Sequence, residues 1–249
     1  MPYSPYIGVT GFMKKAEVSS ALEALDGLPT WSNRSLMVGV LVSSKTLAGK
    51  PNKWPNRYPD VRDIAMLFPP DRRTVNLIHY ATDDRHTLAD QLEVLIRLGG
   101  GKHLDGFQLN VCWPEPATIA VPRTMRIVLQ LGRGALEQTG NDPEVTAKCL
   151  DAYKDVITDV LVDASGGRGI PIDLDAVQAY VRAIGTRHPQ IGIGVAGGLS
   201  SQTLGQLQQL ADLFPNLSVD AEGRLRTAED HLDVEAMKSY ISVADGLFD

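Results

Sequence analysis

Short apolar runs alternate with longer amphipathic segments along the whole chain. Eight runs of a length typical of buried strands lie at residues 6–10, 36–42, 74–79, 106–111, 126–131, 156–162, 191–195 and 217–219. Apolar residues recur at helical spacing at residues 14–25, 59–68, 87–98, 142–153, 173–184, 200–213 and 233–243. Residues 113–123 contain three prolines, so we expect only a short or irregular helix there.

This alternation predicts a parallel β-sheet, because strands that are joined by helical crossovers run in the same direction. Eight strand–helix units in 249 residues, with no break in composition, favour a closed barrel over an open doubly wound sheet. We therefore predict an α/β protein, a (β/α)8 TIM barrel that forms one domain over residues 1–249. In such barrels the active site lies at the C-terminal ends of the strands.

Composition and charge narrow the classes of partner. Apolar residues make up 43% of the chain, which is enough for a packed core and argues against disorder. The formal net charge of −6 argues against a general nucleic-acid or anionic-membrane surface, and no run of 18 apolar residues predicts a membrane span. Cys112 and Cys149 form no CxxC or CxxH pair, so we expect reduced thiols, no metal and no cofactor. Residues 1–12 lack the pattern of a signal peptide, so we expect a cytoplasmic protein. We expect a monomer or homodimer.

The stretch VAGGLSS at residues 195–201 is the sharpest local signal. A strand ends, two glycines turn, and a helix is expected to begin at a serine cap. Backbone N–H groups at such a turn and the positive end of a helix both favour an anion. Phosphate sites in these barrels use the loops after the seventh and eighth strands. Gly197 and Gly198 are therefore candidate phosphate ligands, although an ordinary tight turn fits the pattern equally well.

Asp163 follows the sixth run directly and begins the stretch DASGGRG. If its carboxylate points into the barrel mouth, burial can raise its pKa far enough for general-acid work. The glycines after it, among them Gly167 and Gly169, predict a flexible loop or one that packs closely on a ligand. The alternative is a solvated aspartate in a flexible loop.

Residues 43–59 form a long connection that holds basic residues and no acidic one. The basic residues are Lys45, Lys50, Lys53 and Arg57. Loops longer than about 12 residues without secondary structure are often lids. A cationic lid over the barrel mouth would suit an anionic substrate, with Lys45 and Arg57 as candidate ligands. A solvated surface loop is the alternative.

Two further runs end in residues with useful chemistry. Gln108, Asn110 and Cys112 share one face of the fourth run, so if Gln108 points into the barrel Asn110 does too, and Cys112 lies at the mouth if the strand extends that far. Cys112 is an inert core thiol or, alternatively, a nucleophile or base. His79 ends the third run, and alternation does not settle which way it points. Both remain candidates for an active-site role.

At these same positions the sequence resembles phosphoribosylanthranilate isomerase, the (β/α)8 barrel of tryptophan biosynthesis. Residues 195–199 (VAGGL) are similar to the family's LAGGL, and residues 160–169 (VLVDASGGRG), then Ile172 and Asp173, resemble its LLD…GGxGxxFDW. Weaker similarity joins residues 9–18 (VTGFMKKAEV) to ICGITxPEDV, residues 106–110 (GFQLN) to VQLHG, and residues 218–220 (SVD) to GVDVSSG.

The resemblance implies an Amadori rearrangement of a small phosphorylated substrate, a ribosyl amine. In the family, a general acid protonates the furanose ring oxygen and a base then removes the C2′ proton. The acid falls on Asp163, whereas the family's cysteine base is replaced by Thr10. A threonine hydroxyl without a neighbouring base does not remove a carbon-bound proton at neutral pH. Either another residue is the base, with Cys112 and His79 the candidates by location, or the reaction differs.

The eighth loop also departs from the family. Small hydroxyl residues and glycine surround the phosphate there, whereas this chain has Ala-Glu-Gly-Arg at residues 221–224. Glu222 would repel a phosphate if it pointed inward, while Gly223 and Arg224 could still bind one. Two interpretations follow: an aldose–ketose isomerase related to that family, or a repurposed or non-catalytic barrel that binds a phosphorylated or anionic metabolite.

Overall fold

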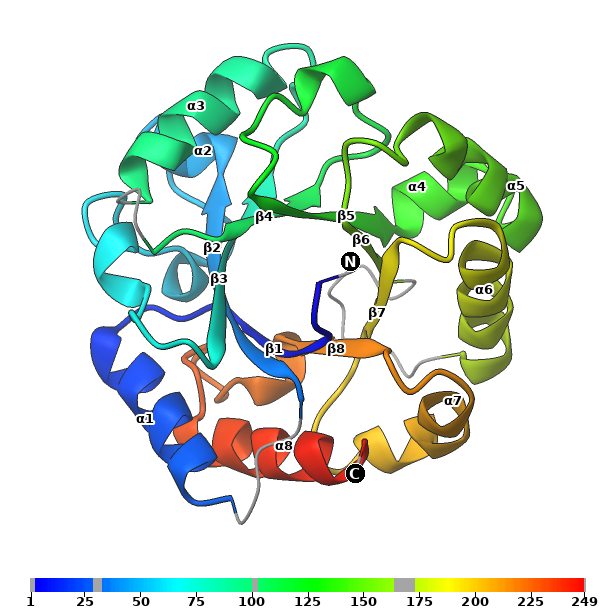
Figure 1. Cartoon of the computed structure of the whole chain (residues 1–249). Coiled ribbons are helices and arrows are strands. Elements are labelled where there is room, and N and C mark those ends of the chain that lie inside the picture. Colours follow the sequence, from blue (N-terminus) through cyan, green and yellow to red (C-terminus); the bar gives the residue numbers. More distant parts are fainter. Residues whose placement is uncertain (1–2, 29–32, 100–102, 164–172, 249) are drawn as a thin grey trace.

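Eight parallel strands close into a barrel in sequence order, as the sequence predicts (Figure 1). The computed structural model describes residues 3–28, 33–99, 103–163 and 173–248. The strands are β1 (Tyr6–Thr10), β2 (Ser35–Ser43), β3 (Thr74–Ala81), β4 (Gly106–Asn110), β5 (Arg126–Gly132), β6 (Asp159–Asp163), β7 (Gly192–Ala196) and β8 (Ser218–Ala221). Pairing of β1 with β8, which sets Ile7 beside Val219, completes the ring.

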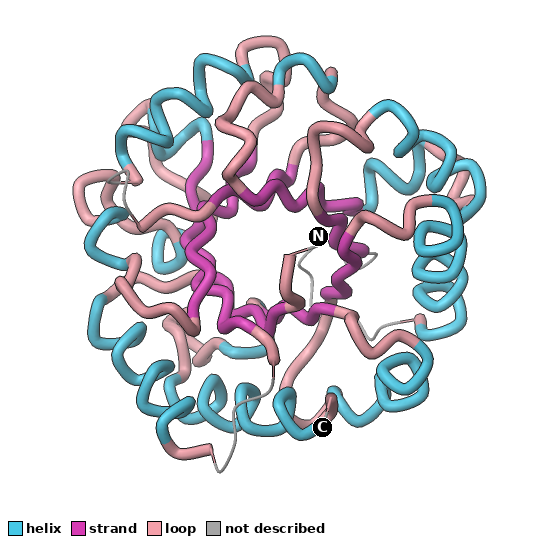
Figure 2. Tube along the Cα trace, in the orientation of Figure 1, coloured by secondary structure: helices cyan, strands magenta, loops and turns pink. Residues whose placement is uncertain are grey.

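Helices surround the strands as an outer ring (Figure 2). They are α1 (Lys15–Asp26), α2 (Ser44–Leu47), α3 (Leu88–Leu98), α4 (Arg133–Gln138), α5 (Pro143–Cys149), α6 (Leu174–Arg187), α7 (Gln208–Leu213) and α8 (Val234–Gly246). Three of them begin where an aspartate carboxylate accepts free backbone N–H groups: Asp142 before α5, Asp173 before α6 and Asp233 before α8. Within the described part of the chain, none of the helices has the length and apolar character needed to span a membrane.

Two predicted helices are shorter than the sequence pattern suggests. Residues 59–68 form only a 3-10 turn, η2 (Ile64–Leu67), because Met66 bonds back by three residues to Asp63 and two prolines follow at 69 and 70. Residues 200–213 form a turn, then η5 (Leu204–Leu207) and α7. The remaining 3-10 turns are η1 (Pro55–Arg57), η3 (Pro116–Thr118), η4 (Leu150–Ala152) and η6 (Gly223–Leu225).

The barrel interior changes character from one end to the other. At the N-terminal end Arg126 and Asp159, both almost fully buried, form an ion pair, and the Arg126 guanidinium also lies 4.9 Å from the Tyr6 ring centroid. Apolar side chains fill the space beyond this pair: Tyr6, Met37, Val75, Leu77, Val128, Leu161 and Ala196. The interior is therefore packed and closed at this end, and polar groups gather at the other.

Candidate active site

Six strands each place one polar side chain inside the C-terminal end of the barrel. They are Thr10, His79, Gln108, Gln130, Asp163 and Asp220, and each residue is at most 6% exposed. Strand alternation explains the set, since inward positions recur every second residue; five of the six follow an apolar inward position or a glycine, and Asp220 follows the buried Ser218. We call these six residues the polar layer. It is the floor of the candidate site.

Hydrogen bonds tie the polar layer together. The Thr10 hydroxyl donates to Asp220, 3.0 Å from Oδ1 and 3.2 Å from Oδ2. The Gln108 amide nitrogen lies 3.3 Å from Asp220 Oδ2 and 3.1 Å from His79 Nδ1. The Gln130 amide nitrogen donates to Asp163 Oδ2 at 2.9 Å. Both buried carboxylates are thus held in fixed positions by donors from neighbouring strands.

Burial shifts the protonation of two members of this layer in opposite ways. Burial raises the pKa of Asp220 to about 7; the bonds from Thr10 and Gln108 oppose the rise, and nearby carboxylates add to it. Burial lowers the pKa of His79, so its ring is neutral at pH 7. Because His79 Nδ1 accepts from the Gln108 amide, its remaining proton sits on Nε2. Asp220 is therefore the member of this pair whose pKa lies near neutral pH.

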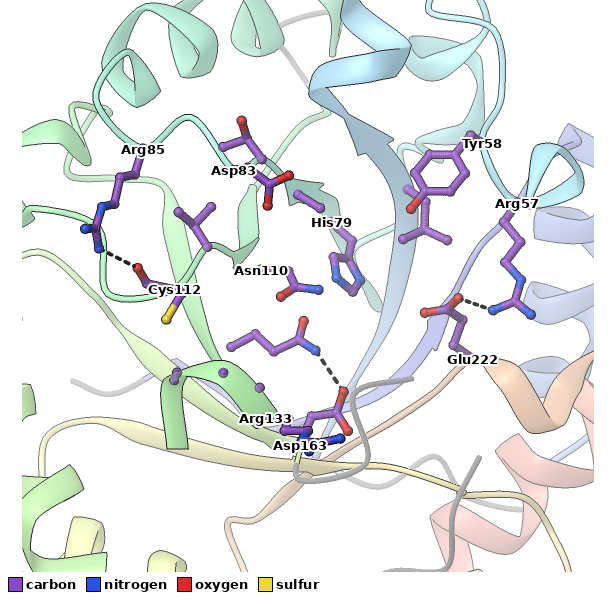
Figure 3. A pocket seen from close by; sticks show the side chains of 18 of the residues that line it. Arg57, Tyr58, His79, Asp83, Arg85, Asn110, Cys112, Arg133, Asp163 and Glu222 are labelled. Carbon is purple, nitrogen blue, oxygen red and sulfur yellow. Dashed lines mark hydrogen bonds and ion pairs between the residues drawn. The ribbon is translucent and has the colours of Figure 1, made fainter. Parts of the chain in front are cut away.

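Above the polar layer lies a cavity of about 730 Å³ (Figure 3). Its lining combines floor residues with groups from the surrounding loops, among them Arg57, Arg85, Asn110, Cys112, Arg133 and Glu222. A smaller cavity of about 30 Å³ shares His79, Gln130, Asp163 and Glu222 with it and adds Gln108, Gly197, Gly198, Asp220 and Gly223. The larger cavity has the volume of a typical small-molecule site. The smaller one holds about a single water or hydroxyl group.

The structure brings most of the predicted residues to these two cavities. Asp163, His79, Cys112, Arg57 and Asn110 line the larger cavity, and Gln108, Gly197, Gly198 and Gly223 line the smaller one. Thr10 lies against Asp220. Lys45 and Arg224 are exposed and line neither cavity. Gly167 and Gly169 lie outside the described residues.

Cys112 was predicted at the mouth, and it lies there, two residues beyond the end of β4. Partial burial raises the pKa of its thiol, and the charge of Arg85 offsets only part of that rise. The neutral thiol is therefore the dominant form at pH 7. This favours a packing or polar-contact role over that of a thiolate base.

The sequence suggested that the connection after β2 is a loop without secondary structure that carries excess positive charge. The structure differs on both points. The connection contains α2 and η1, and Arg57 is paired with two acidic residues of the loop after β8. Arg57 Nη1 lies 2.8 Å from Glu222 Oε1, and Nη2 lies 2.6 Å from Asp230 Oδ1. The Asn56 side chain also donates to the Glu229 carbonyl at 2.9 Å. These contacts hold the β2 connection against the β8 loop, and the Arg57 charge is paired within the protein.

Loss of the Arg57 charge should therefore loosen two loops at once. We expect Arg57→Gln to lower the free energy of unfolding by about 1–3 kcal/mol, because two partly buried carboxylates lose a charged partner. Arg62→Gln is the matched control, since its pair with Asp60 is exposed on both sides and such pairs contribute little. Urea denaturation measures both variants. Equal effects of the two substitutions would contradict this account of the β2–β8 connection.

The glycine turn after β7 differs from its prediction in one respect. Gly197 and Gly198 adopt φ of 111° and 64°, which the sequence pattern of a tight glycine turn anticipates. No helix begins at Ser200, however: its backbone N–H donates to Thr203 Oγ1 at 2.8 Å, and the Thr203 hydroxyl donates to the Gly198 carbonyl at 2.9 Å. An anion at this turn would be held by loop amides, without a helix N-terminus behind them.

Asp220 was missed as a candidate by reasoning from the sequence. The apolar run ends at residue 219, but β8 continues to Ala221, and Asp220 pairs with Gly8 on one side and Ala196 on the other. Strand alternation from the buried Ser218 would have pointed Asp220 inward. The spacing of two residues between Ser218 and Asp220 was the sequence signal that could have identified Asp220.

Comparison with known proteins gives matches in structure but not in sequence. No protein-family model and no curated protein matches the chain. Monomers of the dimeric phosphoribosylanthranilate isomerase from Thermotoga maritima superpose with a TM-score of 0.65 at 13% identity, covering 97% of this chain and 99% of theirs. The chain is similar in fold to phosphoribosylanthranilate isomerases. N-(5′-phosphoribosyl)anthranilate isomerase from Pyrococcus furiosus gives 0.63 at 12% identity with the same coverage. A phosphoribosylanthranilate isomerase in complex with reduced 1-(o-carboxyphenylamino)-1-deoxyribulose 5-phosphate gives 0.63 at 14% identity, again with that coverage.

The expected resemblance is thus confirmed at the level of the fold, over nearly the whole length of both chains. At 12–14% identity the likeness assigns no chemistry to particular residues. Fold alone does not fix function, so the activity has to be argued from the site itself. Among the described residues, no group of three or more His, Cys, Asp or Glu side chains could hold a metal ion.

Proposed function

We propose that the protein is an aldose–ketose isomerase that rearranges a phosphorylated ribosyl amine, in the manner of phosphoribosylanthranilate isomerase. The observation that carries this proposal is Asp163. It lies at the end of β6, buried in the polar layer beneath the larger cavity, where the sequence resemblance puts the general acid of that family. The structural likeness to an isomerase that holds a reduced ribulose phosphate compound supports the same substrate class.

In the proposed reaction Asp163 donates its proton to the furanose ring oxygen. The ring C–O bond breaks, its electron pair stays on that oxygen as a hydroxyl, and a Schiff base remains at C1′. Gln130 holds one carboxyl oxygen of Asp163 with its amide, which fixes the direction from which the proton arrives. Asn110, on the wall of the larger cavity, offers an amide to the sugar hydroxyls.

The phosphate is assigned to the β7 and β8 loops. The smaller cavity is lined by Gly197, Gly198 and Gly223. The first two have positive φ angles, a backbone conformation in which successive N–H groups can bind an anion. Arg224 follows on the exposed side of the same loop. In this proposal the phosphate contacts these loop amides, the smaller cavity itself has room only for a sugar hydroxyl, and the larger cavity, with Trp54 and Tyr58 on its wall, takes the aromatic amine.

The phosphate assignment predicts a change in KM rather than in kcat. We expect Gly198→Ala to raise KM at least about 10-fold, because an alanine resists φ of 64° and shifts the amides of the turn. The matched control is Gly140→Ala, since Gly140 has φ of 68°, is exposed and has open space around it. Steady-state kinetics should show the KM change in the first variant only. Equal KM values in the two variants would remove the phosphate from this turn.

A fluorescence assay for loss of phosphoribosylanthranilate tests the proposed activity. Purified protein should accelerate the loss in proportion to enzyme concentration, and inorganic phosphate should compete. A rate equal to that of heat-inactivated protein would reject the isomerase.

A binding-only role is the second candidate, and Glu222 is the observation that favours it. Its carboxylate lines both cavities, close to the assigned phosphate, and would repel a phosphate there. Arg57 pairs with Glu222 but also with Asp230, so it offsets only part of this repulsion. Binding of a phosphorylated ribosyl compound in calorimetry, together with no turnover in the fluorescence assay, would identify such a protein.

A further inference from the structure

The base that the proposed reaction needs is not one of the residues that the sequence offered. Cys112 carries a neutral thiol at pH 7. The unprotonated nitrogen of His79, Nδ1, is already occupied by the Gln108 amide. Thr10 has no basic atom of its own, although it stands at the position of the family's base. A different group must accept the C2′ proton.

Thr10 directs attention to Asp220. Its hydroxyl lies within hydrogen-bond distance of both carboxylate oxygens of Asp220. Two glycines make room for this pair: a Cβ at Gly8 would lie 2.8 Å from Asp220 Oδ1, and one at Gly39 would lie 2.5 Å from Thr10 Oγ1. Among the described residues, the hydrogen-bond partners of the buried Asp220 carboxylate are the neutral side chains of Thr10 and Gln108.

The smaller cavity provides a second, independent observation. Gln108 is 1% exposed, and its Oε1 has no hydrogen-bond partner within the described part of the chain although the side chain lines this cavity. A buried acceptor without a partner costs free energy, which a ligand hydroxyl or a water in the cavity would recover. Asp163 and Asp220 line the same cavity. A hydroxyl-bearing carbon placed there would face both carboxylates at once.

We propose that Asp220 is the catalytic base of this site, with Thr10 as the residue that positions it. The assignment rests on the proposed isomerase function. The C2′ hydroxyl of the substrate donates to Gln108 Oε1, and this contact turns the C2′ hydrogen toward the Asp220 carboxylate. Thr10 stands at the sequence position of the family's base, and its hydroxyl holds the Asp220 carboxylate in place by a hydrogen bond.

Asp220 takes the proton from C2′, and the C–H electron pair forms the C1′=C2′ double bond. The C=N electron pair of the protonated Schiff base moves onto nitrogen, which becomes neutral. The resulting enolamine becomes the ketose when C1′ gains a proton and the C2′ hydroxyl loses one. Asp220 ends protonated and Asp163 deprotonated, and solvent returns one proton from the first to the second.

Asp220 must be ionised to act, so activity should fall as the pH drops below the pKa of its carboxyl, which burial raises to about 7. Several titratable groups surround it. They are Tyr6 from β1, His79 from β3, Asp163 from β6, Glu222 after β8 and Tyr240 from α8. Both tyrosines have raised pKa values and stay neutral, so the acidic limb near pH 7 belongs to Asp220.

The test compares kcat, KM and pH profiles of wild type and four variants with phosphoribosylanthranilate as substrate. We expect Asp220→Asn to lower kcat at least about 100-fold with KM within about threefold of wild type, and to remove the acidic limb. Asp220→Glu should recover part of kcat together with that limb. Thr10→Val should move the limb to higher pH, because the hydroxyl bond that lowers the Asp220 pKa is lost. Asp105→Asn, at the opposite end of the barrel and also with a raised carboxyl pKa, should behave as wild type.

The outcomes separate this inference from the function on which it rests. A wild type that turns over substrate, with Asp220→Asn retaining kcat within about threefold and the acidic limb in place, overturns the role of Asp220 and leaves the isomerase standing. An acidic limb that Thr10→Val leaves unmoved overturns the positioning role of Thr10. A wild type without turnover overturns both proposals together.

Discussion

Asp163→Asn should lower kcat by at least about 100-fold, because an amide cannot donate the proton that opens the furanose ring. KM should change little, since the asparagine keeps the size of the side chain and its bond with Gln130. Steady-state kinetics over the same substrate range measures both constants. A pre-opened substrate analogue, in which the ring is already broken, should lose far less of its rate.

Asp163→Glu and Asp105→Asn complete that experiment. The glutamate variant retains an acid at a shifted position and should keep more activity than the asparagine variant. Asp105 lies just before β4, at the end of the barrel remote from the cavities, so its replacement should leave kcat unchanged. Near wild-type turnover by Asp163→Asn would remove this carboxyl from the chemistry.

The second large effect concerns stability as a function of pH. Burial holds the pKa of folded Asp220 at about 7, against an ordinary value of 3.8. Between these two values the folded state keeps a proton that the unfolded state releases. The wild type therefore loses stability relative to Asp220→Asn as the pH rises from about 4 to 7, and the loss is complete above 7. The upper bound of this difference is ~4 kcal/mol.

Urea unfolding of both proteins at pH 4.5 and pH 8 measures this change. Asp84→Asn is a control with no change in this range, because hydrogen bonds from Thr87 and its neighbours lower the pKa of the Asp84 carboxyl below its ordinary value of 3.8. This carboxylate is ionised in the folded and the unfolded state at both pH values, so the stability difference between wild type and Asp84→Asn should be the same at pH 4.5 and pH 8. A stability difference between wild type and Asp220→Asn that is the same at both pH values would show that Asp220 is not held neutral by burial.

The fold was readable from the sequence because each strand is a short apolar run followed by a turn or helix signal. Asp142, Asp173 and Asp233 cap helices where the sequence placed them or within one residue. The helix expected at residues 200–213 came out short, since the Thr203 hydroxyl bonds to the backbone of Ser200 and Gly198 in place of a helical turn. Helical periodicity does not register that competition.

The site was readable only in part. Asp163 and the glycines after β7 could be found because the pattern of strand end and turn marks them. The direction of His79 could not, because its run carries polar residues of both parities. The contacts of Asp220 with Thr10, and of Arg57 with Glu222, join residues more than 160 positions apart. Only closure of the barrel, which sets β1 between β8 and β2, brings these groups together.

Carbon-13 NMR of the reaction product tests the central claim most directly. Phosphoribosylanthranilate labelled at C2′ is incubated with the wild-type protein, and the labelled carbon is followed. An isomerase converts this carbinol carbon to a ketone carbon in a single product that retains the anthranilate nitrogen. Enzyme-dependent appearance of that ketone signal is the predicted result. Release of anthranilate with the label still on a carbinol carbon, at the rate seen without protein, would contradict the assignment.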